Sequence, residues 1–123
     1  MKQVFDVVRQ HWVAATPEEI VRQQWIQKMI QELGYPKEYI VVEKELAATM
    51  RRADIVVYSP ACKPLLLIEC KAEALTHADF DQVIGYNATL QAPYLALVNA
   101  KQMLLRPTFD HFPSYQELCD ASR

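Results

Sequence analysis

Four consecutive large apolar residues, Leu65 to Ile68, run directly into the sequence Glu69-Cys70-Lys71. An apolar run of this length predicts a strand that is buried on both faces, at the centre of a sheet. Side chains alternate along a strand, so Glu69 and Lys71 share one face while Cys70 faces the opposite way. Charged residues are rarely placed in such a strand unless they are paired or bound to something. The stretch therefore predicts both the middle of a sheet and a site at the end of that strand.

The composition indicates one soluble globular domain spanning residues 1–123, in which 51% of the residues are hydrophobic. The net charge of −2 provides no global basic field, so any binding of nucleic acid must use a local patch. The three cysteines are an odd number without metal-ligand spacing, which favours reduced thiols. No apolar run approaches membrane-spanning length and no signal core follows Met1, so we expect a cytoplasmic protein without a membrane partner.

A helix is predicted to begin at Thr16, which can act as the N-cap ahead of a proline at the first helical position. It is expected to run to about Leu33 and to stop at Gly34. Glu19 and Arg22 project onto the same side as its apolar stripe. Two roles for Glu19 stay open: it either completes a capping box with Thr16 or contributes to a metal site. The stripe itself consists of Ile26, Met29, Ile30 and Leu33.

Three predicted strands follow this helix, at residues 39–46, 54–58 and 65–71, and a short polar turn separates the first two. A second helix should run from about His77 to Leu90 with Thr76 as its N-cap. Residues 94–99 read as a buried strand. The order helix, three strands, helix, strand predicts a mixed α/β fold in which helices cover a central sheet. The buried stripe expected for the second helix is Phe80, Val83, Ile84 and Leu90.

Outside this core, at about residues 16–100, the two ends of the chain carry additional elements. Residues 3–14 predict a short hairpin or a bent edge strand. Residues 103–106 are expected to pair with the strand at 94–99, and a short helix is expected within 113–121.

The connector between the second and third strands is short, so these strands are expected to form an antiparallel hairpin. A turn centred between Ala61 and Cys62 places Asp54 directly opposite Glu69, with Cβ atoms about 4.5–5.5 Å apart. Two carboxylates so close repel each other and require a positive charge between them. Lys71 is one candidate and a divalent metal is the other.

A metal at this point would give the three charged residues a chemical role. Carboxylate oxygens suit Mg²⁺ or Mn²⁺, and the backbone carbonyl of Cys70 would add a further oxygen. An ammonium beside the metal, here Lys71, can neutralise charge that develops on a phosphate. The alternative is an ion network of Asp54, Lys71 and Glu69 that only fixes the register of the sheet.

Four further residues are candidates for contacts with nucleic acid. Gln82 and Tyr86 lie one turn apart at the rim of the second helix, where an amide and a hydroxyl can reach a phosphate oxygen or a base. Arg51 and Arg52 precede the strand that carries Asp54 and are potential phosphate contacts. The alternative is that the first pair are ordinary boundary residues and that the arginines belong to a solvated turn.

These residues, taken in order, resemble the PD-(D/E)XK nuclease superfamily. The resemblance rests on Arg52-Ala53-Asp54, Glu69-Cys70-Lys71 and Gln82-x-x-x-Tyr86. More narrowly, the chain resembles the nuclease domain at the N-terminus of type I restriction enzyme motor subunits. The segments Thr16 to Gln23 and Gly34-Tyr35-Pro36 fit that family as well, although Ala53 stands where a proline often precedes the acid.

This resemblance implies a restriction-endonuclease-like core, ordered αβββαβ, that cleaves DNA with Mg²⁺. Asp54 and Glu69 would be metal ligands and Lys71 the catalytic lysine. Glu19 would be an acid that reaches the metal through water, and the DNA side would carry Gln82 and Tyr86. We therefore expect a Mg²⁺-dependent DNA endonuclease of a restriction, defence or DNA-processing system, acting on DNA as a homodimer or with a partner subunit. The alternative is a catalytically silent accessory module that binds DNA or protein in a restriction or mobile-element system.

Overall fold

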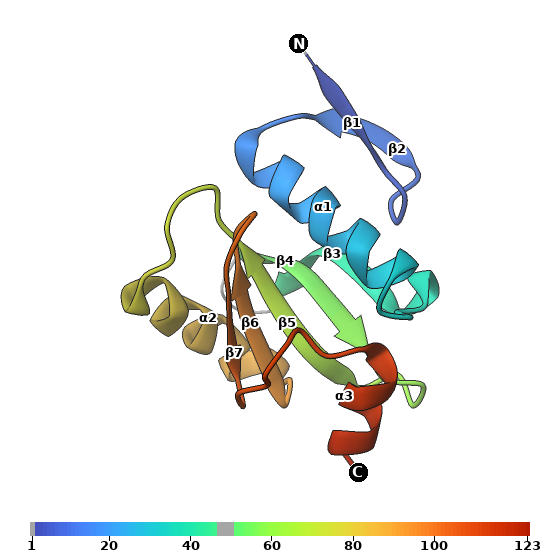
Figure 1. Cartoon of the computed structure of the whole chain (residues 1–123), viewed down its shortest axis with the longest axis vertical. Coiled ribbons are helices and arrows are strands. Elements are labelled where there is room, and N and C mark those ends of the chain that lie inside the picture. The colour runs from blue at the N-terminus through green and yellow to red at the C-terminus, as the bar shows by residue number, and fades with distance from the viewer. Residues whose placement is uncertain (1, 47–50) are drawn as a thin grey trace.

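The computed structural model describes residues 2–46 and 51–123, in which a five-stranded sheet carries helices on both faces (Figure 1). The strands are ordered β3 (Ile40–Leu46), β4 (Arg51–Tyr58), β5 (Pro64–Cys70), β6 (Tyr94–Val98) and β7 (Met103–Arg106). β5 and β6 are parallel, whereas the other neighbouring strands are antiparallel. The predicted mixed sheet flanked by helices, typical of a restriction-endonuclease-like core, is confirmed. The polar turn predicted between the first two strands lies outside the described residues.

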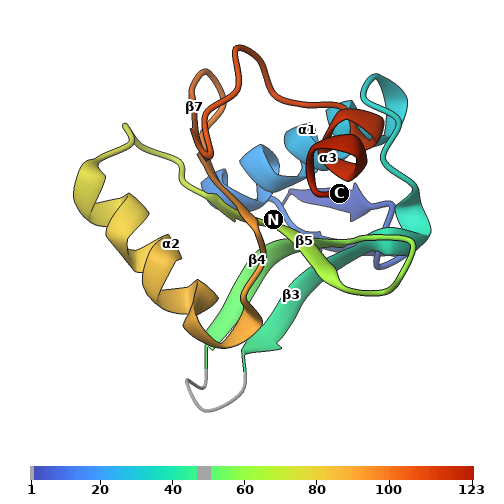
Figure 2. The same ribbon diagram turned by 90° about the horizontal axis from the view of Figure 1, so that it is seen from below.

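The helices divide between the two faces of the sheet (Figure 2). α1 (Pro17–Gln31) and α3 (Tyr115–Ala121) pack in the larger apolar cluster, together with Ile68 and Cys70 of β5. α2 (His77–Leu90) packs in a second cluster, with Leu67 on the opposite face of the same strand. Residues Leu65 to Ile68 are almost completely buried. β5 is therefore the central strand, as predicted, and Cys70 faces away from the α2 side.

The N-terminal segment forms a separate two-stranded hairpin of β1 (Gln3–Asp6) and β2 (His11–Ala14). It lies across α1 on the side away from the sheet (Figure 1). The hairpin predicted for residues 3–14 is thus present, and the predicted pairing of β7 with β6 and the short C-terminal helix are present too. All three cysteines are free.

The start of α1 follows the prediction in only one of its two capping bonds. The Thr16 hydroxyl accepts the backbone N–H of Glu19 at 3.2 Å, as an N-cap should. The reciprocal bond of a capping box does not form, because the N–H of Thr16 donates to the carbonyl of Ala14 at 2.9 Å and the Glu19 carboxylate turns elsewhere. The helix ends at Gln31, two residues before the predicted end, and Gly34 follows with a φ of 72°. The capping box predicted for Glu19 is therefore wrong.

α2 begins and ends at the predicted residues, and Thr76 forms a complete capping box with Asp79. Phe80 and Val83 are buried as expected, but Ile84 is 47% exposed, so its predicted place in the stripe is wrong. The side chain that packs toward the sheet one turn after Val83 is the half-buried ring of Tyr86. Residues three or four positions apart lie on the same side of a helix. At this turn the buried side continues from Val83 to Tyr86, three residues on, and does not include Ile84.

Candidate active site

Two carboxylates meet where β4 and β5 part. Ile55 pairs with Ile68 in the predicted register, and Asp54 and Glu69 are the residues directly beyond this last pair of the ladder. The backbone N–H of Asp54 donates to Glu69 Oε1 at 3.1 Å, and the N–H of Cys70 donates to Asp54 Oδ2 at 2.8 Å. Each acid is thus held by the backbone of the opposite strand. Beyond the last backbone pair of the β4–β5 ladder, the two side-chain carboxylates accept the backbone N–H groups in place of carbonyl oxygens.

Burial, together with the closeness of Asp54, changes the pKa of Glu69. Burial and the negative charge of Asp54 raise the pKa of Glu69 to about 9 from an ordinary value of 4.5. At neutral pH the metal-free pair therefore keeps a proton on Glu69. A cation between the two carboxylates would release that proton, because a metal binds the ionised form.

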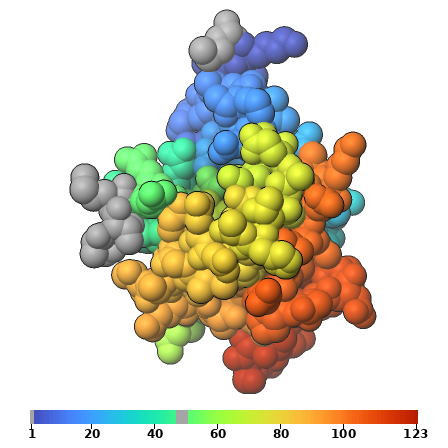
Figure 3. All heavy atoms as spheres, turned by 90° about the vertical axis from the view of Figure 1, so that its left-hand side faces the viewer, coloured from blue at the N-terminus to red at the C-terminus, as the bar shows by residue number. Residues whose placement is uncertain are grey.

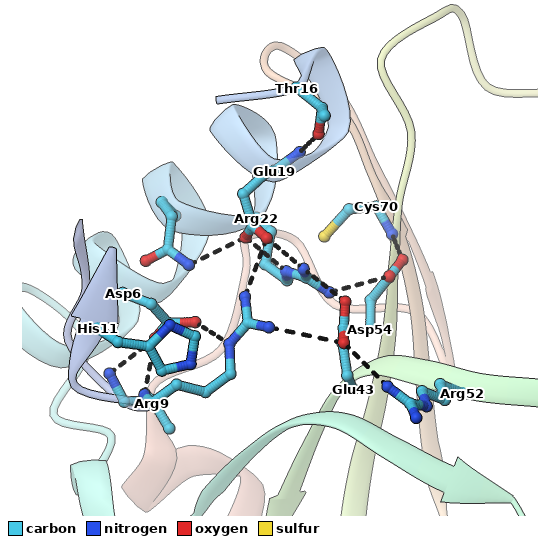
Figure 4. Close-up of polar contacts among 12 residues, drawn as sticks. Asp6, Arg9, His11, Thr16, Glu19, Arg22, Glu43, Arg52, Asp54 and Cys70 are labelled. Carbon is cyan, nitrogen blue, oxygen red and sulfur yellow. Dashed lines mark hydrogen bonds and ion pairs between the residues drawn. The ribbon is translucent and has the colours of Figure 1, made fainter. Parts of the chain in front are cut away.

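Glu19 is joined to Asp54 through the guanidinium of Arg22 (Figure 4). It does not line the pocket that contains Asp54 and Glu69. Its carboxylate accepts hydrogen bonds from Nε and Nη2 of Arg22 at 2.8 and 2.5 Å, and from Arg9 and Gln23 at 2.9 and 3.1 Å. Nη1 of Arg22 in turn donates to Asp54 Oδ1 at 3.3 Å. A guanidinium thus joins Glu19 to Asp54. The structure shows Glu19 in this ionic contact, and the water-mediated metal contact that the resemblance implied stays a prediction.

A pocket of about 170 Å³ opens beside the two acids. Six of the predicted site residues line it, namely Asp54, Glu69, Cys70, Lys71, Gln82 and Tyr86. Lys71 follows directly after β5, and its Nζ lies 3.5 Å from Asp79 Oδ1 in the first turn of α2. The ion pair observed for Lys71 within the described part of the chain is therefore with Asp79, rather than with Asp54 or Glu69.

The two predicted arginines take different positions. Nη1 of Arg51 donates to the hydroxyl of Tyr86 at 2.9 Å, and its guanidinium lies 5.6 Å from the centre of that ring. Arg52 turns toward β3, where it pairs with Glu43 and Glu45 at 3.4 and 3.5 Å. Neither arginine lines the pocket, but Arg51 contacts Tyr86, which does.

A comparison with known protein families agrees with the fold and with the sequence resemblance. Residues 17–118 match the family described as "Type I restriction enzyme R protein N terminus". The chain belongs to this family. No curated protein matches the chain. The family places the chain among components of restriction enzymes, as the sequence resemblance predicted. In the described part of the chain, none of the helices is long and apolar enough to cross a membrane.

Three charged residues at this pocket were not among the predicted site residues. Glu18 and Asp79 line the pocket, and Arg22 contacts Asp54 from α1. The signal for Arg22 was present in the sequence, because an arginine on the buried side of a helix needs a carboxylate partner. Asp79 was recognisable only as a residue of the first helical turn. Its contact with Lys71 depends on the path of residues 72–76 between β5 and α2.

The donor set of the pocket suits a magnesium-type ion with an incomplete protein shell. No group of three or more His, Cys, Asp or Glu side chains with metal-binding geometry occurs among residues 2–46 and 51–123. Asp54 and Glu69 are the adjacent pair of acids in the pocket that could supply side-chain oxygens. Mg²⁺ commonly uses one or two carboxylates and keeps several waters, so a pair of acids is sufficient for it. The repulsion expressed in the raised pKa of Glu69 is also relieved by a cation at this point.

Proposed function

We propose that this chain is a divalent-metal-dependent DNA endonuclease that serves a restriction or DNA-processing system. The observation that supports this function most is the pocket, which brings Asp54, Glu69 and Lys71 together beside Gln82 and Tyr86. Two acids and an ammonium within one small concave site form a suitable set for hydrolysing a phosphodiester. The family adds the restriction context.

In this proposal Asp54 and Glu69 hold Mg²⁺ or Mn²⁺, and the adjacent carbonyl of Cys70 is a further candidate oxygen. The bound metal would supply positive charge to the phosphate and lower the pKa of its water. Lys71 stabilises negative charge that develops on the phosphoryl oxygens. Asp79, 3.5 Å from the ammonium, keeps Lys71 at the pocket wall.

The DNA side of the site would lie on α2 and at the start of β4, which share one face of the molecule (Figure 3). The exposed amide of Gln82 and the hydroxyl of Tyr86 offer hydrogen bonds to phosphate oxygens or bases. Arg51, which already contacts Tyr86, adds a positive charge to the same edge. Glu18 and Asp79 make the remaining wall acidic, so a phosphate is expected to enter from the Arg51 and Tyr86 side.

The test is cleavage of supercoiled, linear and branched DNA by the purified chain with Mg²⁺ or Mn²⁺. Lys71→Ala is expected to lower the cleavage rate at least 100-fold, which is the order of one lost electrostatic contact in a transition state. Lys63→Ala removes an exposed lysine of the β4–β5 connection and should leave cleavage unchanged. Circular dichroism must give the same spectrum for both variants. Equal inactivity of the wild type and Lys71→Ala on every substrate would contradict the proposal.

A catalytically silent DNA- or protein-binding module is the second candidate. It is favoured by the hydrogen bonds of Asp54 and Glu69, because both acids accept backbone N–H groups and so have a structural use without a metal. The two candidates differ in Mn²⁺ binding. An endonuclease binds Mn²⁺ in a manner that Asp54→Asn abolishes, whereas a silent module gives no heat of binding in calorimetry.

A further inference from the structure

The β1–β2 hairpin lies before the family-matched segment, yet its turn reaches the charged residues beside the pocket. Arg9 donates from Nε to Asp6 Oδ2 at 2.5 Å and from Nη2 to Glu19 Oε1 at 2.9 Å. Asp6 is fully buried, and its Oδ1 accepts the backbone N–H groups of Val8 and Arg9 at 2.8 and 2.9 Å. The turn is therefore fixed by its own carboxylate, and it presents Arg9 to α1 in a defined orientation.

Arg22 is held more tightly than an arginine at a surface ion pair. Its guanidinium forms a two-bond fork with Glu19, as described above, and Nη2 also lies 3.2 Å from Glu43 Oε1. Glu43 interrupts β3 with a φ of 55°, a left-handed conformation that is uncommon for a residue other than glycine. Both Glu19 and Arg22 are buried, so few other partners are available to either of them.

These contacts leave one donor of Arg22 directed at Asp54. Nη1 reaches Asp54 Oδ1, while Asp54 Oδ2 accepts the N–H of Cys70 (Figure 4). One oxygen of the Asp54 carboxylate thus accepts a hydrogen bond from α1, and the other accepts one from β5. A rotation of this side chain would break one of the two bonds.

We propose that Arg22 is a positioning residue that sets the orientation of Asp54, and that Arg9 secures Arg22 through Glu19. The hairpin outside the family-matched segment thereby becomes a structural part of the site. The metal-binding consequence rests on the proposed function, because Asp54 is a proposed ligand, whereas the orientation of Asp54 itself does not.

A conservative variant separates positioning from charge. Loss of the positive charge at Arg22 would by itself favour a metal at Asp54, because like charges repel. Arg22→Lys keeps the charge but lacks the planar fork that binds Glu19 and Asp54 at the same time. A role as a simple counter-ion predicts that lysine is sufficient. A positioning role predicts that it is not.

The first measurement is amide hydrogen exchange by NMR without divalent metal. Arg22→Lys is expected to accelerate exchange of the Cys70 N–H about 10-fold relative to that of Leu67 in the same strand, because the bond to Asp54 opens locally. Arg9→Gln, at a partly exposed position, should act in the same direction by about 3-fold, and it serves if Arg22→Lys does not fold. Met29→Ala, a core control on α1, should accelerate both amides equally.

The second measurement is calorimetric titration with Mn²⁺. Arg22→Lys is expected to weaken Mn²⁺ binding about 10-fold, the lower range for loss of a group that orients a metal ligand. An unchanged ratio of Cys70 to Leu67 exchange in Arg22→Lys and Arg9→Gln would overturn the positioning role. If the exchange ratio changes in these variants but the wild-type protein binds no Mn²⁺, the positioning of Asp54 is supported and the proposed function is refuted.

Discussion

Replacing Glu69 by Gln is expected to stabilise the protein at neutral pH while removing a proposed metal ligand. Burial and Asp54 raise the pKa of Glu69 to about 9 in the folded state, against 4.5 as its ordinary value. Below pH 4.5 both the folded and the unfolded chains hold the proton, so this carboxyl has no effect on the free energy of unfolding. Between pH 4.5 and 9 only the folded chain keeps it. The free energy of unfolding therefore falls as the pH rises through this window.

The size of this free-energy change follows from the difference between the pH of the experiment and the ordinary pKa of Glu69. Each unit is equivalent to about 1.4 kcal/mol, so retaining the proton at pH 7 costs at most about 3 kcal/mol. Gln has the shape of a protonated Glu and can still accept the N–H of Asp54. We therefore expect Glu69→Gln to raise the free energy of unfolding by about 1 to 3 kcal/mol at pH 7.

Urea denaturation in EDTA at pH 5, 6, 7 and 8 measures this difference. The gain from Glu69→Gln should be small at pH 5 and should increase at each step toward pH 8. Glu117→Gln is a useful control, because that exposed carboxyl has a pKa that is shifted downward, chiefly by the backbone N–H of Ser114, and its removal gives no such rise. A pH-independent difference, or a less stable Glu69→Gln protein at every pH, would refute the reasoning.

Three further experiments test other parts of the structure. Burial alone would raise the pKa of Glu19, but hydrogen bonds from Arg22 lower it to about 2. The ionised Glu19 therefore stabilises the fold above pH 4.5, and this contribution is lost as the pH falls toward 2. Glu19→Gln should lower the free energy of unfolding at pH 7 by about 1 to 3 kcal/mol in urea denaturation, and an unchanged value would contradict this ion pair. Mn²⁺ at 100 times its dissociation constant should raise the Tm by about 10 °C, a rise that Asp54→Asn should abolish in a thermal scan. Ile84→Lys should change stability by less than about 0.5 kcal/mol, whereas Phe80→Ala should cost about 3 to 4 kcal/mol. Similar losses for the two would mean that α2 faces the sheet differently.

The parts of the fold and site that sequence reasoning predicted depend on local signals. The apolar run ending at Glu69 identified the central strand. The register predicted from the short β4–β5 connection is present at Ile55 and Ile68, although a register shift between Val57 and Tyr58 lies closer to the turn. Thr76 marked the start of α2 with a complete capping box. In each case neighbouring residues in the chain decide the outcome, so no knowledge of distant contacts was needed.

The errors arose where two local solutions were equally good and a distant contact decided between them. Glu19 has the correct spacing for a capping box, but the donors of Arg9 and Arg22 are charged and outcompete the single N–H of Thr16. Arg9 comes from a hairpin whose placement against α1 the sequence does not indicate. The position of Ile84 depended in the same way on whether Tyr86 packed inward.

The end of the β4–β5 ladder also explains why two acids can occupy this partly buried position. Both Asp54 and Glu69 accept backbone N–H groups that the diverging strands would otherwise leave without a partner. Asn and Gln could accept the same bonds without the two effects that raise the pKa of Glu69, namely burial of a carboxylate and repulsion by Asp54. The hydrogen bonds therefore account for side chains with an oxygen at these positions. The ion pair with Arg22 also accounts for a charge at Asp54, but not for one at Glu69. Under the proposed function, a carboxyl in place of an amide at Glu69 has a purpose, because a carboxylate there would complete a negative site for a cation beside Lys71.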